Sequence, residues 1–146
     1  MPFIVDGDNL LGTWPGRKRS DADRRRLAME LGRFSARSRR RVVTVFDGTP
    51  PPGSSFGAAV HFSGPGRSAD DLILALLRTE SNRRGWIVVT SDRSLGDQCR
   101  HLEARVERSD RFRRRLTQEA REEKPDREED VAYWLDQFGE ETEENP

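Results

Sequence analysis

The sequence predicts a three-layer α/β fold, in which helices cover both faces of a mostly parallel central sheet. Short apolar runs alternate along the chain with longer segments whose apolar residues recur at helical spacing. Two of the runs, residues 42–46 and 86–90, are apolar or β-branched almost throughout, which is typical of strands buried on both faces. Strands that alternate with helices in this way form parallel sheets.

Strands are expected where an apolar run ends at turn-forming residues. The first run, Phe3 to Val5, is followed by Asp6-Gly7-Asp8-Asn9, which we interpret as a turn. The expected strands are residues 3–5, 42–46, 58–62, 86–90 and 104–106, the last of them at an edge of the sheet.

Helices are expected between these strands. Ser20 and Asp21 can cap a helix over about residues 22–36. Ser68, with an acidic residue three positions later, resembles a capping box at the start of a second helix. A short helix is expected to run through Cys99, another over about residues 112–122, and a separate last helix from Pro125.

Composition limits the class of protein. The 146 residues suffice for one domain, of which 33% are hydrophobic and 36% charged. No stretch is apolar enough for a membrane span, and Asp6 and Asp8 interrupt the only apolar residues at the start, unlike a secretory signal. The single cysteine, Cys99, excludes an intrachain disulfide framework. We therefore expect a cytoplasmic protein that does not contact a membrane.

Charge is distributed unevenly along the chain. Residues 118–146 contain 12 acidic and 3 basic residues, a net charge of −9, so residues 1–117 carry +9. We expect residues 1–117 to form the domain, which binds a polyanion, and residues 118–146 to form an acidic helical extension. This extension carries an apolar stripe formed by Val131, Trp134, Leu135 and Phe138. We favour the interpretation that the stripe packs back on the domain. The alternatives are that the helix contacts a protein partner or that it covers the basic face of the domain.

Acidic residues recur at the expected carboxyl ends of the strands. Asp6, Asp47 and Asp92 each follow a strand, while Asp70 and Asp71 lie in the first turn of a helix. Ligands of parallel sheets bind at this edge, and carboxylates gathered there repel one another unless a cation compensates. Hard oxygen ligands favour Mg²⁺ or Mn²⁺. Asp47, followed by Gly48, is equally suited to fixing its own loop.

These residues carry a resemblance to a known family. The stretches concerned are Ile4-Val5-Asp6-Gly7, Asn9-Leu10-Leu11-Gly12 with Trp14, Val45-Phe46-Asp47, Ser68-Ala69-Asp70-Asp71 with Ile73, and Thr90-Ser91-Asp92. Over about residues 3–117 they resemble, in matching order, the NYN domain, and more closely its YacP-like branch within the PIN-like nuclease superfamily. The resemblance implies a Rossmann-like sheet and metal-dependent endoribonuclease activity, and ribosome association is a property of the branch.

The resemblance also implies roles for single residues. Asp6, Asp70 and Asp92 match the catalytic acids that bind metal, and Asp71 matches a frequent second acid. Asn9 matches the amide that follows the first acid. Asp8 is a departure, because the branch usually has a tyrosine there, and we expect it to support the site, either by adding a ligand or by weakening RNA stacking nearby. The expected reaction is hydrolysis of an RNA phosphodiester, with Asp6 and Asp92 holding one ion and Asp70 and Asp71 completing or sharing a second.

Other residues are expected to support this site. Asn9, Thr90 and Ser91 would orient carboxylates or contact a phosphate. Trp14 is a candidate for stacking on an RNA base, and Arg17, Lys18 and Arg19 are candidates for contacts to the backbone of an mRNA, tRNA or rRNA substrate.

Cys99, His61 and His101 do not have the spacing of a zinc site.

Three other functions are alternatives to the nuclease. The first is a binding module that recruits RNA or the ribosome and has lost catalysis. A phosphatase with an aspartate nucleophile also begins with a strand and Asp-x-Asp, but it needs a lysine near the site, and neither Lys18 nor Lys124 follows an expected strand. A dinucleotide-binding domain would need a G-x-G-x-x-G turn after the first strand, which the sequence lacks.

Overall fold

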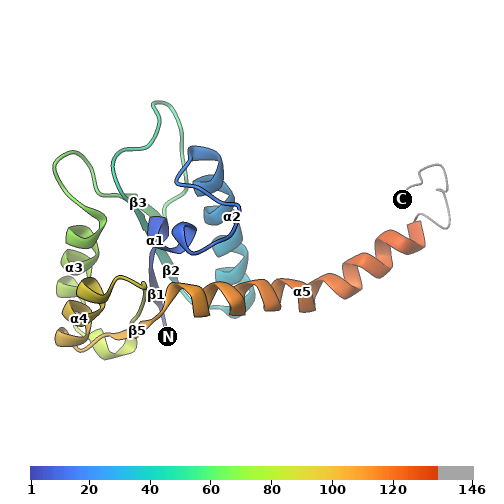
Figure 1. Ribbon diagram of the computed structural model, residues 1–146. Helices are drawn as coiled ribbons and strands as arrows, with labels where there is room; N and C mark the ends of the chain where they lie inside the picture. The colour runs from blue at the N-terminus through green and yellow to red at the C-terminus, as the bar shows by residue number, and fades with distance from the viewer. Residues whose placement is uncertain (135–146) are drawn as a thin grey trace. The chain divides into compact units, whose positions relative to one another are not determined.

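A computed structural model of the chain describes residues 1–134, with side chains described as far as residue 122. Its centre is a five-stranded sheet in the order β3-β2-β1-β4-β5, and every neighbouring pair of strands is parallel (Figure 1). The strands are β1 (Phe3–Asp6), β2 (Val42–Phe46), β3 (Val60–Phe62), β4 (Ile87–Val89) and β5 (Arg105–Glu107). The predicted α/β class with a mostly parallel sheet is therefore confirmed.

The helices connect the strands, as the alternation of patterns predicted. They are α1 (Gly7–Gly12), α2 (Asp21–Ser38), α3 (Ala69–Thr79), α4 (Arg93–His101) and α5 (Ser109–Trp134), with a short 3₁₀ helix at Arg83–Gly85. The predicted caps are confirmed. Ser20 accepts a hydrogen bond from the Asp23 amide, and Ser68 and Asp71 form a complete capping box at the start of α3.

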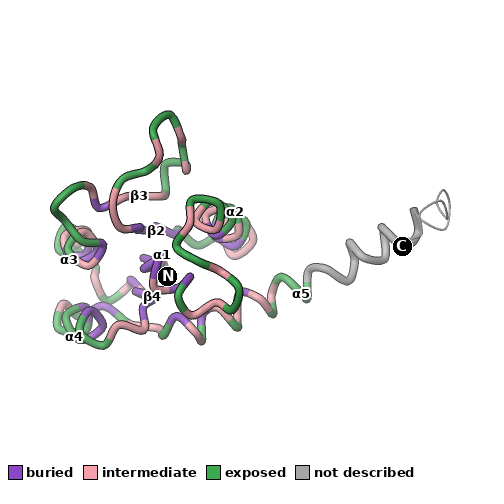
Figure 2. Tube along the Cα trace, turned by 45° about the horizontal axis from the view of Figure 1, so that its top comes forward, coloured by how far each residue is buried: buried purple, intermediate pink, exposed green. Residues whose placement is uncertain are grey.

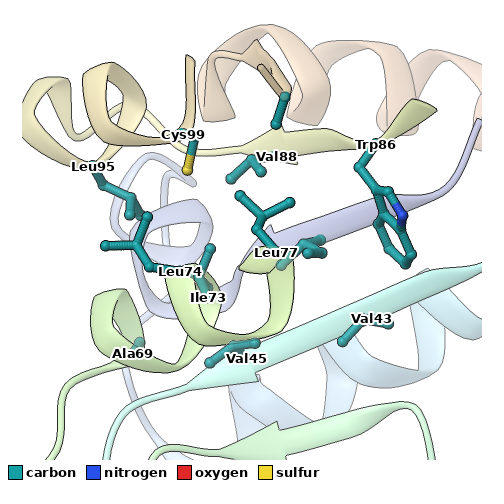
Figure 3. Close-up of a cluster of buried hydrophobic side chains, with 12 residues drawn as sticks. Val43, Val45, Ala69, Ile73, Leu74, Leu77, Trp86, Val88, Leu95 and Cys99 are labelled. Carbon is teal, nitrogen blue, oxygen red and sulfur yellow. The ribbon is translucent and has the colours of Figure 1, made fainter. Parts of the chain in front are cut away.

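One face of the sheet packs against α3 and α4. Figure 3 shows Ile73, Leu74 and Leu77 of α3 beside Val45 and Val88 of the strands, with Leu95 and Cys99 of α4 completing the cluster. Most of these side chains are completely buried, and each fully buried aliphatic side chain stabilises the fold by about 1.5–3 kcal/mol. This packing fixes where the first turns of α3 and α4 lie relative to the ends of the strands.

The opposite face packs against α2 and the first turn of α5. Phe3 of β1, Phe34 of α2 and Phe112 of α5 form a group of three rings whose centroids lie 5.4–5.6 Å apart. Figure 2 shows the buried residues concentrated on the strands and on the sides of the helices that face them. The result is the predicted arrangement of three layers.

Two predicted elements differ from the structure. Residues 7–12, expected to begin with a turn, form helix α1, because burying Leu10 and Leu11 completely outweighs the turn preference of Gly7 and Asp8. The predicted break at Pro125 was also wrong, since the backbone of α5 continues through Pro125 to Trp134. A proline there removes only one helical hydrogen bond, that of its own missing N–H.

The chain divides into two compact units, Met1–Arg113 and a second unit that starts at Arg114. The division into residues 1–117 and an acidic extension stays a prediction. The apolar stripe of that extension lies outside the residues whose side chains are described. No described helix has both the length and the apolar character that crossing a membrane requires.

Candidate active site

The order of the strands reverses at β1. From β1 the chain builds β2 and β3 on one side and then returns to add β4 and β5 on the other. Ligands of open α/β sheets bind at such a reversal, in the crevice beyond the carboxyl ends of the strands. Val5 pairs with Val89, so Asp6 at the end of β1 and Thr90 just after β4 lie next to each other. The fold therefore brings the predicted first acid to the expected binding edge.

Thr90 links two of the predicted acids. Its hydroxyl donates a hydrogen bond of 2.8 Å to Oδ2 of Asp6 and accepts one of 3.1 Å from the backbone amide of Asp92. Both Thr90 and Asp6 are buried. Although Asp6 occupies the cap position of α1, its side chain makes no capping hydrogen bond. The Asp6 carboxylate is therefore oriented by Thr90 rather than used to begin a helix.

The electrostatic surroundings of Asp6 are unfavourable for its charge. Burial raises the pKa of Asp6 to about 7, a hydrogen bond from Thr90 opposes the rise, and the carboxylates of Asp70, Asp47 and Asp8 add to it. A cation bound there would offset both the burial of the Asp6 charge and its repulsion by the neighbouring carboxylates.

Asp70 lies in the first turn of α3 and faces the same group. Its pKa is raised by burial and then by the carboxylates of Asp92, Asp47 and Asp71. No hydrogen-bond donor in the described part of the chain reaches the Asp70 carboxylate. Asp6, Asp47, Asp70 and Asp92, which we name the carboxylate cluster, thus come from separate segments and act on one another electrostatically.

The other predicted acids also hold the ends of elements in place. Oδ1 of Asp92 accepts a hydrogen bond from the Leu95 amide and caps α4, and the Asp71 side chain closes the capping box of α3. Oδ1 of Asp47 accepts a hydrogen bond of 2.7 Å from the amide of Ala69. Asp47 therefore joins the end of β2 to the start of α3, which agrees with the loop-fixing alternative.

Asp8 is turned toward α2 and is held by an arginine. Nε and Nη2 of Arg24 lie 2.9 and 2.8 Å from its two carboxylate oxygens, and the Asp47 amide donates a further hydrogen bond of 3.0 Å. Asp8 is buried, so this pair compensates its charge inside the protein. The second acid of the Asp-x-Asp motif is thereby engaged, which disfavours the phosphatase alternative.

Asn9 connects three segments near the carboxylate cluster through hydrogen bonds. Its Oδ1 accepts hydrogen bonds from the Ser91 amide at 2.8 Å and from Oγ of Ser109 at 2.6 Å. The Ser109 amide in turn donates to Oγ of Ser91 at 2.9 Å. Asn9 and Ser91 thus fix the ends of β1 and β4 to the start of α5.

The chemistry of the carboxylate cluster fits a hard divalent cation. All the metal-ligating atoms that the cluster offers are carboxylate oxygens, and their mutual repulsion needs a compensating charge. The Asp70 carboxylate accepts no hydrogen bond from the described part of the chain. Among the described residues, no three His, Cys, Asp or Glu side chains are grouped closely enough to enclose an ion as they stand. Binding an ion would therefore require these side chains to turn toward it.

The predicted RNA-binding residues follow α1. The guanidinium of Arg17 stacks on Trp14 at 3.6 Å from the ring centroid and makes two hydrogen bonds, of 2.6 and 2.8 Å, to Glu30. Its side chain is only 5% exposed, so Arg17 joins this loop to α2. Lys18 and Arg19 are exposed.

Three features were missed by the sequence reasoning. Arg24 was not among the expected site residues, yet it binds Asp8, and no local pattern marked it because the contact depends on how α2 packs beside α1. Ser109 gave no signal, because its partners lie far away in sequence. Arg93, Arg100 and Arg108 surround a hollow beside Asp92.

The cysteine and the two histidines, which were not expected to form a metal site, lie on different elements. Cys99 is completely buried in the cluster between α3 and α4, whereas His61 on β3 and His101 at the end of α4 are exposed.

Comparison with known proteins agrees with this fold. Crystal structures of Rae1 (YacP) from Bacillus subtilis have the same fold. One matches with a TM-score of 0.73 and 21% identity, covering 97% of this chain and 89% of that chain. Its W164L mutant matches with a TM-score of 0.72 and 23% identity, covering 84% and 79%. No curated protein matches. A model of the YacP-like NYN domain matches residues 3–142, which includes most of the acidic segment beyond residue 117. The chain therefore belongs to the family of YacP-like NYN domains.

Proposed function

We propose that the protein is a divalent-metal-dependent endoribonuclease that hydrolyses phosphodiester bonds within RNA. The observation that carries the proposal is the gathering of Asp6, Asp47, Asp70 and Asp92 at the reversal of strand order, where burial and then the neighbouring carboxylates raise the pKa values of Asp6 and Asp70. Membership of a nuclease-related family supports a hydrolase. The cluster contains the donors that a phosphodiester hydrolase of this kind needs.

Asp6, Asp70 and Asp92 would hold Mg²⁺ or Mn²⁺, with Asp71 in support. When bound, the ion supplies an acidified water at neutral pH and neutralises charge on the phosphate. Thr90 keeps the Asp6 carboxylate oriented through its hydrogen bond. Asn9 and Ser91 keep the ends of β1 and β4 together, so that Asp6 and Asp92 stay on one edge.

RNA would reach this edge along the basic part of the chain. Lys18 and Arg19 are exposed and free to contact phosphates, whereas Arg17 is engaged by Glu30 and covers one face of Trp14. Contacts of this kind give salt-dependent affinity with little dependence on base sequence.

The test compares RNA cleavage by the wild type, Asp70→Asn and Asp21→Asn with Mg²⁺, with Mn²⁺ and in EDTA. Asp21 is an exposed acid in the first turn of α2 and is not among the charges that act on Asp6 or Asp70, so its substitution removes a similar charge from a helix start without touching the cluster. We expect cleavage only with metal, a loss on the order of 100-fold or more in Asp70→Asn, and no loss in Asp21→Asn.

Two results would overturn the proposal. Cleavage that persists in EDTA, or that is unchanged by Asp70→Asn, would remove the metal or Asp70 from the reaction. RNA binding by a wild type that cleaves nothing under any of these conditions would support the non-catalytic binding module instead.

A further inference from the structure

We infer that a hollow beside Asp92 binds an internal phosphate of the RNA chain, next to the phosphate that is cleaved. The inference rests on the proposed function for its ligand and on a separate set of residues for its geometry. The hollow has a volume of about 230 Å³ and lies where α4 starts and β5 ends. Its lining includes Ser91, Asp92, Arg93, Gly96, Arg100 and Arg108.

The charged side chains around the hollow favour an anion. Arg93, Arg100 and Arg108 outnumber Asp92 and Asp97. Arg100 lies 3.2 Å from Asp97 and Arg108 lies 3.3 Å from Asp110, but all four side chains are largely or partly exposed. Exposed ion pairs of this kind contribute little, so both guanidiniums can turn to a ligand at small cost.

Arg93 is the third guanidinium at the hollow. No ion pair engages Arg93 in the described part of the chain, and Asp92 already caps α4. Planar guanidiniums that converge on one small space suit a tetrahedral oxyanion, to which each can donate two parallel hydrogen bonds.

The backbone around the hollow adds to the positive potential. Helix α4 begins at Arg93, so the positive end of its dipole lies at this wall. Oγ of Ser91 accepts a hydrogen bond from the Ser109 amide, and its own O–H has no acceptor among the described residues. Most of the residues that line the hollow are polar or charged, which favours a phosphate with its water over an apolar ligand.

Asp92 joins this hollow to the carboxylate cluster. It lines the hollow and also raises the pKa of Asp70 by its charge. A phosphate held by the arginines would therefore lie beside the reacting phosphate on the same RNA strand. Holding it there would fix which linkage faces the carboxylates without reading any base.

The experiment measures binding rather than cleavage, so that it is independent of the proposed reaction. Affinity for a fluorescent single-stranded RNA is measured in EDTA over a range of salt concentrations. The variant is the triple substitution Arg93→Gln, Arg100→Gln and Arg108→Gln. The matched control is Arg26→Gln, Arg33→Gln and Arg84→Gln, which removes the same charge from exposed positions and also breaks two surface ion pairs.

We call the triple substitution at Arg93, Arg100 and Arg108 the pocket variant. We expect it to lose affinity for RNA, and the control variant to keep its affinity. The slope of log K against log salt should fall by roughly 0.7 for each phosphate that the variant no longer neutralises. Gly96→Leu keeps every charge and fills the hollow, because a Cβ there already lies 3.6 Å from Arg100 and Val106. It should weaken binding as well, while Gly96→Ala, whose contacts are ordinary, should not. Melting temperatures identify any variant that fails to fold.

Neutral methylphosphonate linkages placed one at a time along the RNA identify the phosphate. The wild type should lose affinity at one particular linkage, and the pocket variant should show no further loss there. Equal losses in the pocket and control variants, or no loss in either, would overturn the inference whether or not the protein cleaves RNA. A loss that appears only with RNA carrying a 5′-terminal phosphate would assign the hollow to chain ends, and so overturn an internal phosphate.

Discussion

Arg24 holds both carboxylate oxygens of Asp8, at 2.9 and 2.8 Å, between helices α1 and α2. The Arg24 side chain is 13% exposed and that of Asp8 only 2%, so the pair is shielded from solvent. It compensates the charge of an acid that lies next to the carboxylate cluster, and it ties α1, which follows Asp6 directly, to the long helix α2.

Replacing one partner of this pair should strongly lower the stability of the fold. We expect Arg24→Met to lower the free energy of unfolding by about 3–5 kcal/mol, because it leaves a buried carboxylate without a compensating charge. Adding Asp8→Asn should restore part of the loss, since an amide oxygen can still accept the hydrogen bond from the Asp47 amide. Urea denaturation of the three proteins measures both effects. A loss below about 1 kcal/mol in the single variant, typical of exposed pairs, would contradict this view of the pair.

Gly7 should not tolerate a side chain. A Cβ there would lie 2.4 and 2.6 Å from two ring carbons of Phe46 and 3.1 Å from the carbonyl oxygen of Val45. Phe46 is completely buried, so its ring has little room to move. We expect Gly7→Ala to destabilise the fold by about 1–3 kcal/mol in thermal or urea unfolding.

Gly32 provides the control for this substitution. It lies within α2 with nothing near the position of a Cβ, so Gly32→Ala should stabilise the protein by up to about 1 kcal/mol. Equal effects of the two substitutions would contradict the close contact at Gly7.

The stability of the metal-free protein should depend on pH through Asp6. Because the pKa of Asp6 is about 7 in the folded protein and 3.8 as its ordinary value, the folded state binds a proton more tightly. The stabilisation is fully present below pH 4 and is lost as the pH rises through about 7. Melting temperatures in EDTA between pH 5.5 and pH 8 should therefore fall for the wild type relative to Asp6→Asn. Parallel pH dependence in the two proteins would show that Asp6 is ionised throughout.

Cys99 should be unreactive in the folded protein. Burial raises the pKa of its thiol to about 12, and the charges of Asp70 and Asp6 add to the rise, so almost no thiolate is present at pH 8. Iodoacetamide at pH 8 should modify the native protein far more slowly than the protein in urea. Modification at similar rates in both would contradict the packing between α3 and α4.

The sequence predicted the positions of the acids better than their partners. Asp6 and Asp92 follow apolar runs, and a parallel sheet necessarily brings the ends of such runs to one edge. Arg24 could not be assigned to Asp8 in this way, because the contact depends on how α2 packs beside α1. Helix α1 itself was missed, since Gly7 and Asp8 are typical turn residues and only the complete burial of Leu10 and Leu11 shows why they are helical.

The hydrogen bonds below the carboxylate cluster join residues that are synthesised far apart in time. Asp6 is bonded to Thr90, 84 positions later, and Asn9 to Ser109, 100 positions later. A nascent chain that has emerged only as far as α3 contains Asp6 and Asp70 but neither of these partners. Long-range contacts of this kind form late, after most of the unit is available to fold. Until β4 and the start of α5 have been synthesised, Asp6 and Asn9 therefore lack the partners that hold them at the carboxyl ends of the strands.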